Sequence, residues 1–236
     1  MRLFLCEKPS QAKDIAAVLG ASRRGDGCWV GPNATVTWCI GHLLETAPPD
    51  AYDERYKRWV LADLPIVPQQ WKMRVKPKTA SQYKAVKRLL GEARELVIAT
   101  DADREGEMIA RELVEHCRYR GPIQRLWLSA LDDASIRKAL AALKPGADTF
   151  NLYHAALGRS RADWLIGMNM SRLFTLLGRK SGYQGVLPVG RVQTPTLKML
   201  VDRDAKILRF QKERYYTVGI QSGSLKADSG RIASMD

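Results

Sequence analysis

Residues 95–107 read ELVIATDADREGE and hold a strand signal, an acidic cluster and a helix start in one short run. The first six residues are mostly apolar, which predicts a buried strand over residues 95–100. Acidic residues follow at once, and an amphipathic helix is predicted over residues 104–117. Ligands of open parallel sheets bind beyond the carboxyl ends of the strands. The acidic junction between strand and helix is therefore a candidate binding site.

The start of the chain repeats this arrangement. Residues 3–6, LFLC, form a second apolar run that ends sharply at Glu7, and they predict another buried strand. Pro9 then favours the start of a helix that runs to Leu19 and stops at Gly20. Two predicted strands thus each end in an acidic residue ahead of a helix.

Strands and helices alternate through the first 150 residues. The other predicted elements are a hairpin over 28–40, a long ordered loop over 46–78, helices over 81–93 and 134–143, and a strand over 123–128. This alternation predicts an α/β fold with a parallel sheet covered on both faces. From residue 151 the pattern changes to long helices over 151–178 and 191–208, and residues 215–220 predict a strand.

The 236-residue chain carries a formal net charge of +13. Residues 151–214 hold 12 basic and 4 acidic residues, so a net charge of +8 lies in this segment. Such a balance favours a polyanionic partner, nucleic acid before an anionic membrane surface. The alternative for charge alone is a solvated helical face. The longest uncharged stretch, 27–44, is broken by glycine, proline and asparagine, which excludes a membrane-spanning segment there.

The four cysteines, Cys6, Cys28, Cys39 and Cys117, form no CxxC pair, and three lie in apolar runs. We interpret them as reduced, mostly buried thiols of a cytoplasmic protein, with no zinc site in this chain. The apolar run at residues 3–6 is too short for a secretory signal peptide.

Glu7, Asp101, Asp103 and Glu105 are the candidate metal ligands. The i, i+2 spacing turns Asp101 and Asp103 to one side of an extended chain, and Glu105 can return toward them from the first helical turn. Four converging carboxylates repel one another unless they are protonated or neutralised by a hard cation. Oxygen-only ligands favour Mg²⁺ over zinc. The alternative is that the two aspartates cap the following helix.

A strand that ends in Glu7, followed about a hundred residues later by DADREG at 101–106, resembles the TOPRIM domain of topoisomerases and primases. Four more motifs extend the resemblance: EKPS at 7–10, IGHL at 40–43, RSRADW at 159–164 and GRVQTP at 190–195. Together they resemble bacterial type IA DNA topoisomerases, with the topoisomerase III branch as the best match. The motifs cover nearly the whole chain.

The resemblance implies three domains. A Rossmann-like TOPRIM domain would span residues 1–150, a mainly α-helical domain that binds single-stranded DNA would span 151–212, and residues 213–236 would begin a β-rich arch domain. The implied function is cleavage, passage and religation of DNA strands, which relaxes or decatenates DNA. The implied cofactor is Mg²⁺, held by the four acidic residues, and the implied partner is single-stranded DNA.

In this reaction a tyrosine attacks a phosphodiester, forms a 5′-phosphotyrosyl link and releases a 3′-hydroxyl. The resemblance implies that Glu7 and Lys8 are catalytic. Lys8 would give the leaving 3′-oxygen a proton or a positive field, and Glu7 would transfer a proton or position the leaving hydroxyl. Mg²⁺ would order the scissile phosphate and neutralise its charge. An ordinary surface lysine is the alternative for Lys8.

Arg159 and Asp163 are four residues apart on a predicted helix and share a face. The resemblance implies that Arg159 contacts a backbone phosphate and Asp163 a neighbouring nucleotide; a structural ion pair is the alternative. Arg191 and Gln193 follow Gly190, which allows close backbone approach. They would contact a phosphate and a sugar or base edge. The alternative for Gln193 is capping of the helix.

The family's nucleophile is a tyrosine in a Tyr-Pro-Arg context, but none of the eight tyrosines here is followed by proline. We therefore expect an N-terminal portion that needs the C-terminal topoisomerase domains, with a helicase as a further candidate partner. The rival functions are a truncated single-stranded DNA-binding module that does not cut, and a TOPRIM primase or nuclease. The expected location is cytoplasmic, at the nucleoid and away from membranes.

Overall fold

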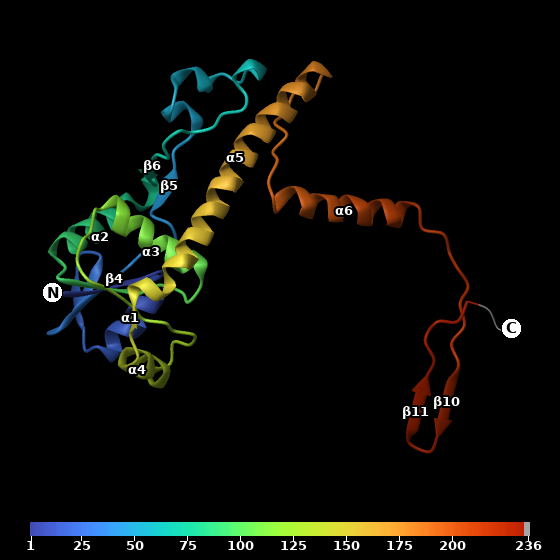
Figure 1. The fold of residues 1–236 in the computed structure, drawn as a ribbon. Coiled ribbons are helices and arrows are strands. Elements are labelled where there is room, and N and C mark those ends of the chain that lie inside the picture. Colours follow the sequence, from blue (N-terminus) through green and yellow to red (C-terminus); the bar gives the residue numbers. More distant parts are fainter. Residues whose placement is uncertain (234–236) are drawn as a thin grey trace. The chain divides into compact units, whose positions relative to one another are not determined.

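The structure is a computed structural model that describes residues 1–233. The chain forms two compact units: the first spans Met1–Gly190, and the second begins at Arg191. Figure 1 shows that the first unit is built around a central sheet flanked by helices. Among the described residues, no helix combines the length and the apolar character needed to span a membrane.

The central sheet has seven strands: β1 (Arg2–Cys6), β2 (Arg23–Gly25), β3 (Cys28–Val30), β4 (Ala34–Trp38), β7 (Glu95–Ala99), β8 (Ile123–Arg125) and β9 (Lys144–Pro145). Their order is β2-β3-β4-β1-β7-β8-β9. The middle strands β4, β1, β7 and β8 are parallel, whereas β2, β3 and β9 pair antiparallel at the edges. The predicted α/β fold with a parallel sheet is confirmed, with antiparallel strands added at both edges.

Helices cover both faces of this sheet, α2 (Ala80–Glu92) and α3 (Arg104–His116) on one side and α1 (Pro9–Val18) and α4 (Asp133–Ala141) on the other (Figure 1). Successive residues of a strand point to opposite faces, so each strand feeds two cores. The core under α2 and α3 includes Leu3, Leu5, Leu96, Ile98, Val86, Leu89, Ile109 and Leu113. The core under α1 and α4 includes Phe4, Cys6, Val97, Ala99, Ile15 and Ile136.

The cysteines agree with their interpretation as mostly buried thiols. All four are free, and Cys6, Cys28 and Cys39 are buried. Burial raises the pKa of the Cys39 thiol well above its ordinary value, so this thiol stays neutral inside the core.

The strand predicted over 123–128 is shorter than expected, because β8 ends at Arg125. Its neighbour β7 ends at Ala99. Leu126 N–H still donates to the Ile98 carbonyl at 2.9 Å, and the chain then leaves the sheet.

A two-stranded antiparallel ribbon, β5 (Leu44–Thr46) with β6 (Met73–Val75), carries the predicted long loop between its strands. The short 3-10 helices of the first unit are η1 (Pro49–Ala51), η2 (Glu54–Lys57), η3 (Leu61–Asp63), η4 (Pro77–Thr79) and η5 (Gly146–Thr149).

The long helix α5 (Phe150–Lys180) packs against α3 and η3, so it is part of the first unit. Asn169 joins it to the long loop, because its Oδ1 accepts from Ile66 N–H at 2.6 Å and its Nδ2 donates to the Ile66 carbonyl at 3.0 Å. The domain boundaries drawn from the sequence at residues 150 and 212 stay predictions.

The second unit contains α6 (Gln193–Leu208) and an antiparallel hairpin of β10 (Gly219–Ser222) with β11 (Leu225–Asp228). The strand predicted over 215–220 therefore begins later, at Gly219, and Tyr216 makes only an isolated bridge with Ile232. No described residue of α6 is buried. The last three residues of the predicted arch segment, 234–236, lie outside the described residues.

Candidate acidic active site and nucleic-acid pocket

The acidic residues at the ends of β1 and β7 meet at one edge of the sheet. The two strands are adjacent and parallel, with Cys6 paired to Ala99, so the residues that follow them emerge side by side. Asp101 N–H donates to Glu7 Oε2 at 3.2 Å. This part of the predicted site is therefore assembled by the register of two neighbouring strands.

Lys8 lies between these two carboxylates. Its Nζ is 2.7 Å from Asp101 Oδ2 and 3.7 Å from Glu7 Oε1. The hydrogen bond to Asp101 is the main cause that raises the pKa of Lys8 above its ordinary value. Burial and the charge of Asp101 together raise the pKa of the Glu7 carboxyl, although the Asp101 N–H and the Lys8 charge act in the opposite direction. A cation thus already sits between two acidic groups that repel each other.

Asp103 caps the N-terminus of α3. Its Oδ1 accepts from Gly106 N–H at 2.7 Å, which is the capping role considered as the alternative for this residue. The DADREG motif needs a glycine at position 106, because a Cβ atom there would collide with the Asp101 backbone. The cap uses one of the two carboxylate oxygens, so it is compatible with metal binding through the other.

Glu105, in the first turn of α3, pairs with His42. Its Oε1 lies 2.9 Å from His42 Nε2, and His42 Nδ1 lies 2.9 Å from Glu112 Oε1. Burial lowers the pKa of His42, but hydrogen bonds and charge interactions with Glu112 and Glu105 outweigh it and raise the pKa overall. Within the described chain, no three His, Cys, Asp or Glu residues are grouped as a metal site. The expected convergence of all four acids is therefore not present in this conformation.

The acidic residues nevertheless fit a hard cation chemically. Glu7, Asp101 and Asp103 offer only oxygen atoms, and the Lys8 ammonium stands where positive charge is needed. Mg²⁺ is commonly held by one or two carboxylates together with water and substrate phosphates, and it does not require a complete protein cage. The candidate ligands Glu7, Asp101, Asp103 and Glu105 stay predictions.

A buried charge network behind the acidic loop was missed by the sequence reasoning. Arg125 and Glu107 have fully buried side chains and pair with each other, and Glu107 also pairs with Arg111 at 3.0 Å. Arg125 donates further to the carbonyls of Ile98, Thr100, Leu126 and Asp101. Burial lowers the pKa of Arg125 even with Glu107 beside it. This network holds the end of β7 in place, together with the chain that leads from it to Asp101.

Gln11 was also missed. It is the third residue of α1 and only 4% exposed, and its side chain bonds both Glu7 and Asp101. The available signal was its i+4 spacing from Glu7, which places a polar side chain on the first helical turn facing the strand end.

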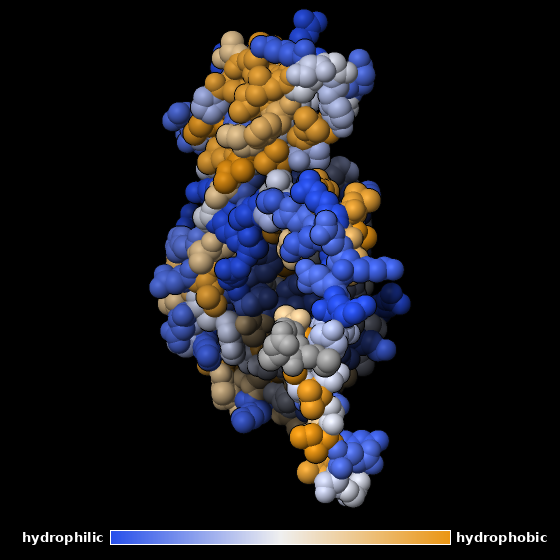
Figure 2. All heavy atoms as spheres, turned by 90° about the vertical axis from the view of Figure 1, so that its right-hand side faces the viewer, coloured by the Kyte–Doolittle hydropathy of each residue, from blue (hydrophilic) through white to orange (hydrophobic). Residues whose placement is uncertain are grey.

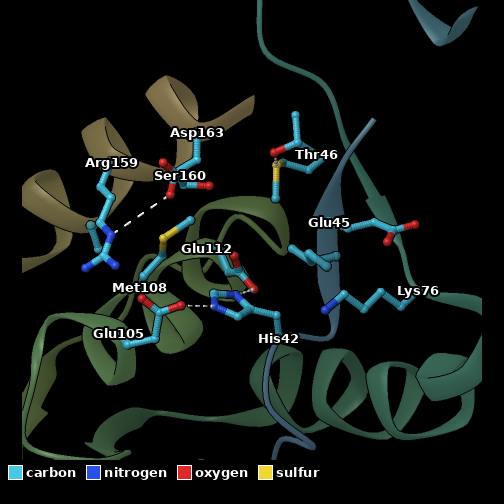
Figure 3. A pocket seen from close by; sticks show the side chains of 13 residues that line it. His42, Glu45, Thr46, Lys76, Glu105, Met108, Glu112, Arg159, Ser160 and Asp163 are labelled. Atoms are coloured by element: carbon cyan, nitrogen blue, oxygen red, sulfur yellow. Dashed lines mark hydrogen bonds and ion pairs between the residues drawn. The ribbon is translucent and has the colours of Figure 1, made fainter. Parts of the chain in front are cut away.

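A pocket of about 450 Å³ lies between α5, α3 and the β5–β6 ribbon (Figure 3). Arg159, Ser160 and Asp163 face it from α5, and Glu105, Met108 and Glu112 face it from α3, while His42 and Lys76 close the other side. Arg159 Nε lies 4.0 Å from Asp163 Oδ2, a loose i, i+4 pair. Two of the predicted DNA-binding residues thus share a cavity with Glu105.

Arg191 and Gln193, the other predicted DNA-binding residues, lie in the second unit. Both are exposed, and Gln193 is the first residue of α6. The N-cap of α6 is Val192, whose side chain makes no capping bond.

Hydrophobic side chains gather over the C-terminal part of α5 in the upper region of Figure 2. Beyond its first residue, Phe150, the exposed large apolar residues of this helix are Ile166, Met168, Met170, Phe174 and Leu177. Such patches mark interaction surfaces in soluble proteins.

Comparison with known proteins identifies the family of this chain. Residues 2–131 match the family model of the Toprim domain, and residues 147–234 match a DNA topoisomerase model. The chain therefore belongs to the Toprim family. Within it, the chain is similar to the N-terminal portion of topoisomerase III-like enzymes of type IA.

The relatives are similar over nearly all of this chain. DNA topoisomerase 3 of Vibrio cholerae is 48% identical over 223 residues, which are 92% of this chain and 34% of the relative. The Salmonella typhimurium protein of the same name is 46% identical, with the same coverage. The solved structure of full-length topoisomerase I from Thermotoga maritima matches 96% of this chain and 34% of its own, with a TM-score of 0.64 and 26% identity. The chain thus spans about a third of the length of these relatives.

Proposed function

We propose that this chain supplies the acidic catalytic centre and part of the single-stranded DNA-binding surface of a type IA DNA topoisomerase, an isomerase that relaxes or decatenates DNA. The observation that carries the proposal is the contact of Lys8 with Glu7 and Asp101 at the ends of two adjacent parallel strands. The similarity to DNA topoisomerase 3 proteins supports the same assignment.

In the proposed reaction a tyrosine oxygen from another domain attacks a DNA phosphorus. A tyrosyl–phosphorus bond forms, the bond from phosphorus to the 3′-oxygen breaks, and the tyrosine proton is lost to a base. Lys8 gives the leaving 3′-oxygen a proton, and Glu7 holds the resulting hydroxyl for religation. The hydrogen bond from Lys8 to Asp101 keeps the lysine charged and aimed at this edge.

Glu7, Asp101 and Asp103 are the residues that would hold Mg²⁺, and Glu105 would join them after leaving His42. The cation would order the scissile phosphate and neutralise its charge. Lys8 occupies the space between two of these ligands, so its side chain would move aside or share the site with the metal.

The pocket beside α5 is proposed to hold a nucleotide of the bound strand. Arg159 and Lys76 supply positive charge at its wall, and Met108 supplies an apolar surface. Among the described residues, buried Glu112 Oε2 has no hydrogen-bond partner, and a base amino group would satisfy it. Arg191 and Gln193, in the second unit, are the other residues proposed to contact DNA.

The remaining domains of a longer protein are the proposed partners. The curated relatives are about three times as long as the matched region, and the exposed apolar residues of α5 offer a surface to cover. The catalytic tyrosine, a helicase partner and association with the nucleoid stay predictions from the sequence.

The test incubates this chain with end-labelled single-stranded DNA and Mg²⁺. We expect binding that weakens steeply with salt and no denaturation-resistant adduct, because no tyrosine here has the family's context. Arg159→Ala should lower the affinity and reduce the slope of log K against log salt by about one; Arg88→Ala, on the exposed side of α2, is the control. Binding that ignores salt would contradict the DNA assignment, and released fragments without an adduct would favour a nuclease.

A further inference from the structure

Gln11 is a buried polar residue in the first turn of α1 whose side chain links the two strand ends. Its Oε1 accepts from Glu7 N–H at 2.8 Å, and its Nε2 donates to Asp101 Oδ1 at 3.2 Å. The residue is only 4% exposed. Both ends of the amide are therefore used, and both bonds go to residues of the acidic centre.

The bond to Glu7 has a structural purpose. The N-cap residue of α1, Lys8, makes no side-chain capping bond, so Gln11 reaches back to a donor just before the helix. This resembles the return bond of a capping box, in which a glutamine at the third helical position satisfies a backbone N–H. Capping alone explains the accepting oxygen of Gln11 and leaves its donating nitrogen unexplained.

The donating nitrogen orients Asp101. Oδ2 of Asp101 bonds the Lys8 ammonium, whereas Oδ1 bonds Gln11. The Lys8 and Asp101 side chains are 55% and 40% exposed, so solvent weakens their ion pair and it holds the carboxylate loosely. The buried amide is fixed by its helix and by Glu7, and it restrains the carboxylate on the other side.

We propose that Gln11 is a positioning residue for the candidate metal ligand Asp101: it holds this carboxylate in the orientation that shares a cation with Glu7. The proposal rests on the function proposed above, and it concerns how the chain prepares the cation site. Partners that orient ligand side chains in metal sites typically change metal affinity by about 10- to 100-fold when they are removed.

The chain offers a matched control in Gln82 of α2. It is also buried, at 8% exposure, and its Nε2 donates to the Trp38 carbonyl at 2.7 Å and to the Gly27 carbonyl at 3.2 Å. Its partners belong to the hairpin side of the sheet and not to the acidic centre. Replacing either glutamine by methionine removes a buried amide of similar size, so general damage is comparable.

The experiment compares the whole chain with its Gln11→Met and Gln82→Met variants. Binding of Mn²⁺ is measured by titration calorimetry, affinity for a single-stranded oligonucleotide is measured in EDTA, and folding is checked by thermal unfolding. We expect both variants to melt earlier. Gln11→Met alone should lose about tenfold or more in Mn²⁺ affinity, with oligonucleotide affinity unchanged.

Gln11→Ala is the second variant, because it leaves room for water at the Glu7 N–H and protects folding if methionine does not fit. It should lose Mn²⁺ affinity to a similar extent. Mn²⁺ affinities of the Gln11 variants equal to that of the wild type would overturn this inference while leaving the proposed function in place. If the wild-type chain shows no saturable Mn²⁺ binding, and Asp101→Asn gives the same result, the metal site of the proposed function is wrong. This inference is then wrong with it.

Discussion

Lys8 Nζ lies 2.7 Å from Asp101 Oδ2, although 93 positions separate the two residues in the sequence. The contact exists because β1 and β7 are neighbours in the sheet and end at the same level. It places the proposed proton donor and a candidate metal ligand in direct contact. The proposed chemistry depends on this pair.

Replacing Lys8 should separate metal binding from catalysis. Lys8→Ala removes a cation that competes with the metal for Glu7 and Asp101. Mn²⁺ affinity should therefore rise severalfold, an effect on the order of 1 kcal/mol for an exposed charge. Titration calorimetry measures this, and Lys13→Ala, exposed on the same helix, should change nothing. Weaker Mn²⁺ binding by Lys8→Ala would show that the lysine supports the metal and does not compete with it.

Gly106 should not tolerate even a methyl group. A Cβ atom there would meet the Asp101 backbone, so Gly106→Ala should displace the acidic loop, lower the melting temperature and weaken Mn²⁺ binding. Gly91 is also helical, in α2, and a Cβ there would meet open space. Gly91→Ala should be neutral or stabilise by about 0.5–1 kcal/mol. Equal effects of the two substitutions on melting would contradict the close approach at Gly106.

The buried pair Arg125 and Glu107 should be strongly coupled. Arg125→Met removes one of the two arginines that pair with the buried Glu107 carboxylate and leaves only Arg111. This change should cost about 3–5 kcal/mol in the free energy of unfolding. The double variant with Glu107→Met should cost less than the sum of the two single changes. Urea denaturation of the four proteins gives the coupling energy. Simple additivity would mean that the two side chains act independently.

His42 should make stability depend on pH. Its pKa is raised in the folded protein, so its contribution to stability is complete below its unfolded pKa of about 6.5 and disappears as pH rises through the folded pKa. The gap in unfolding free energy between wild type and His42→Gln should thus be wide at low pH and narrow at high pH. His154→Gln, on the exposed side of α5, is the control. If the difference in unfolding free energy between wild type and His42→Gln widened as pH rose, the pKa of His42 would be lowered by folding and not raised.

The strands and the acidic ends of β1 and β7 could be predicted because their signals are local. The apolar run before Glu7 and the run before Asp101 each define a strand and its end within six residues. Helix α1 begins at Pro9, as expected from the fixed backbone angle of proline.

The contacts that organise the site could not be predicted, because they join distant positions. Glu105 was expected to turn toward Asp101, but its carboxylate bonds His42, 63 positions away in the sequence. Arg125 reads as an ordinary charged residue at a strand end, and only the packing of β8 against β7 shows that it is fully buried. Helix α5 follows a change of pattern near residue 150, yet its contacts with α3 keep it in the first unit.

The most direct test of the proposed function is relaxation of negatively supercoiled plasmid by this chain joined to the remaining two thirds of a DNA topoisomerase 3 relative. We expect Mg²⁺-dependent relaxation from the wild-type fusion, and losses of about 100-fold or more from the Lys8→Ala and Asp103→Asn fusions. Relaxation by the Lys8→Ala fusion at the wild-type rate would contradict the catalytic role assigned to the acidic centre of this chain.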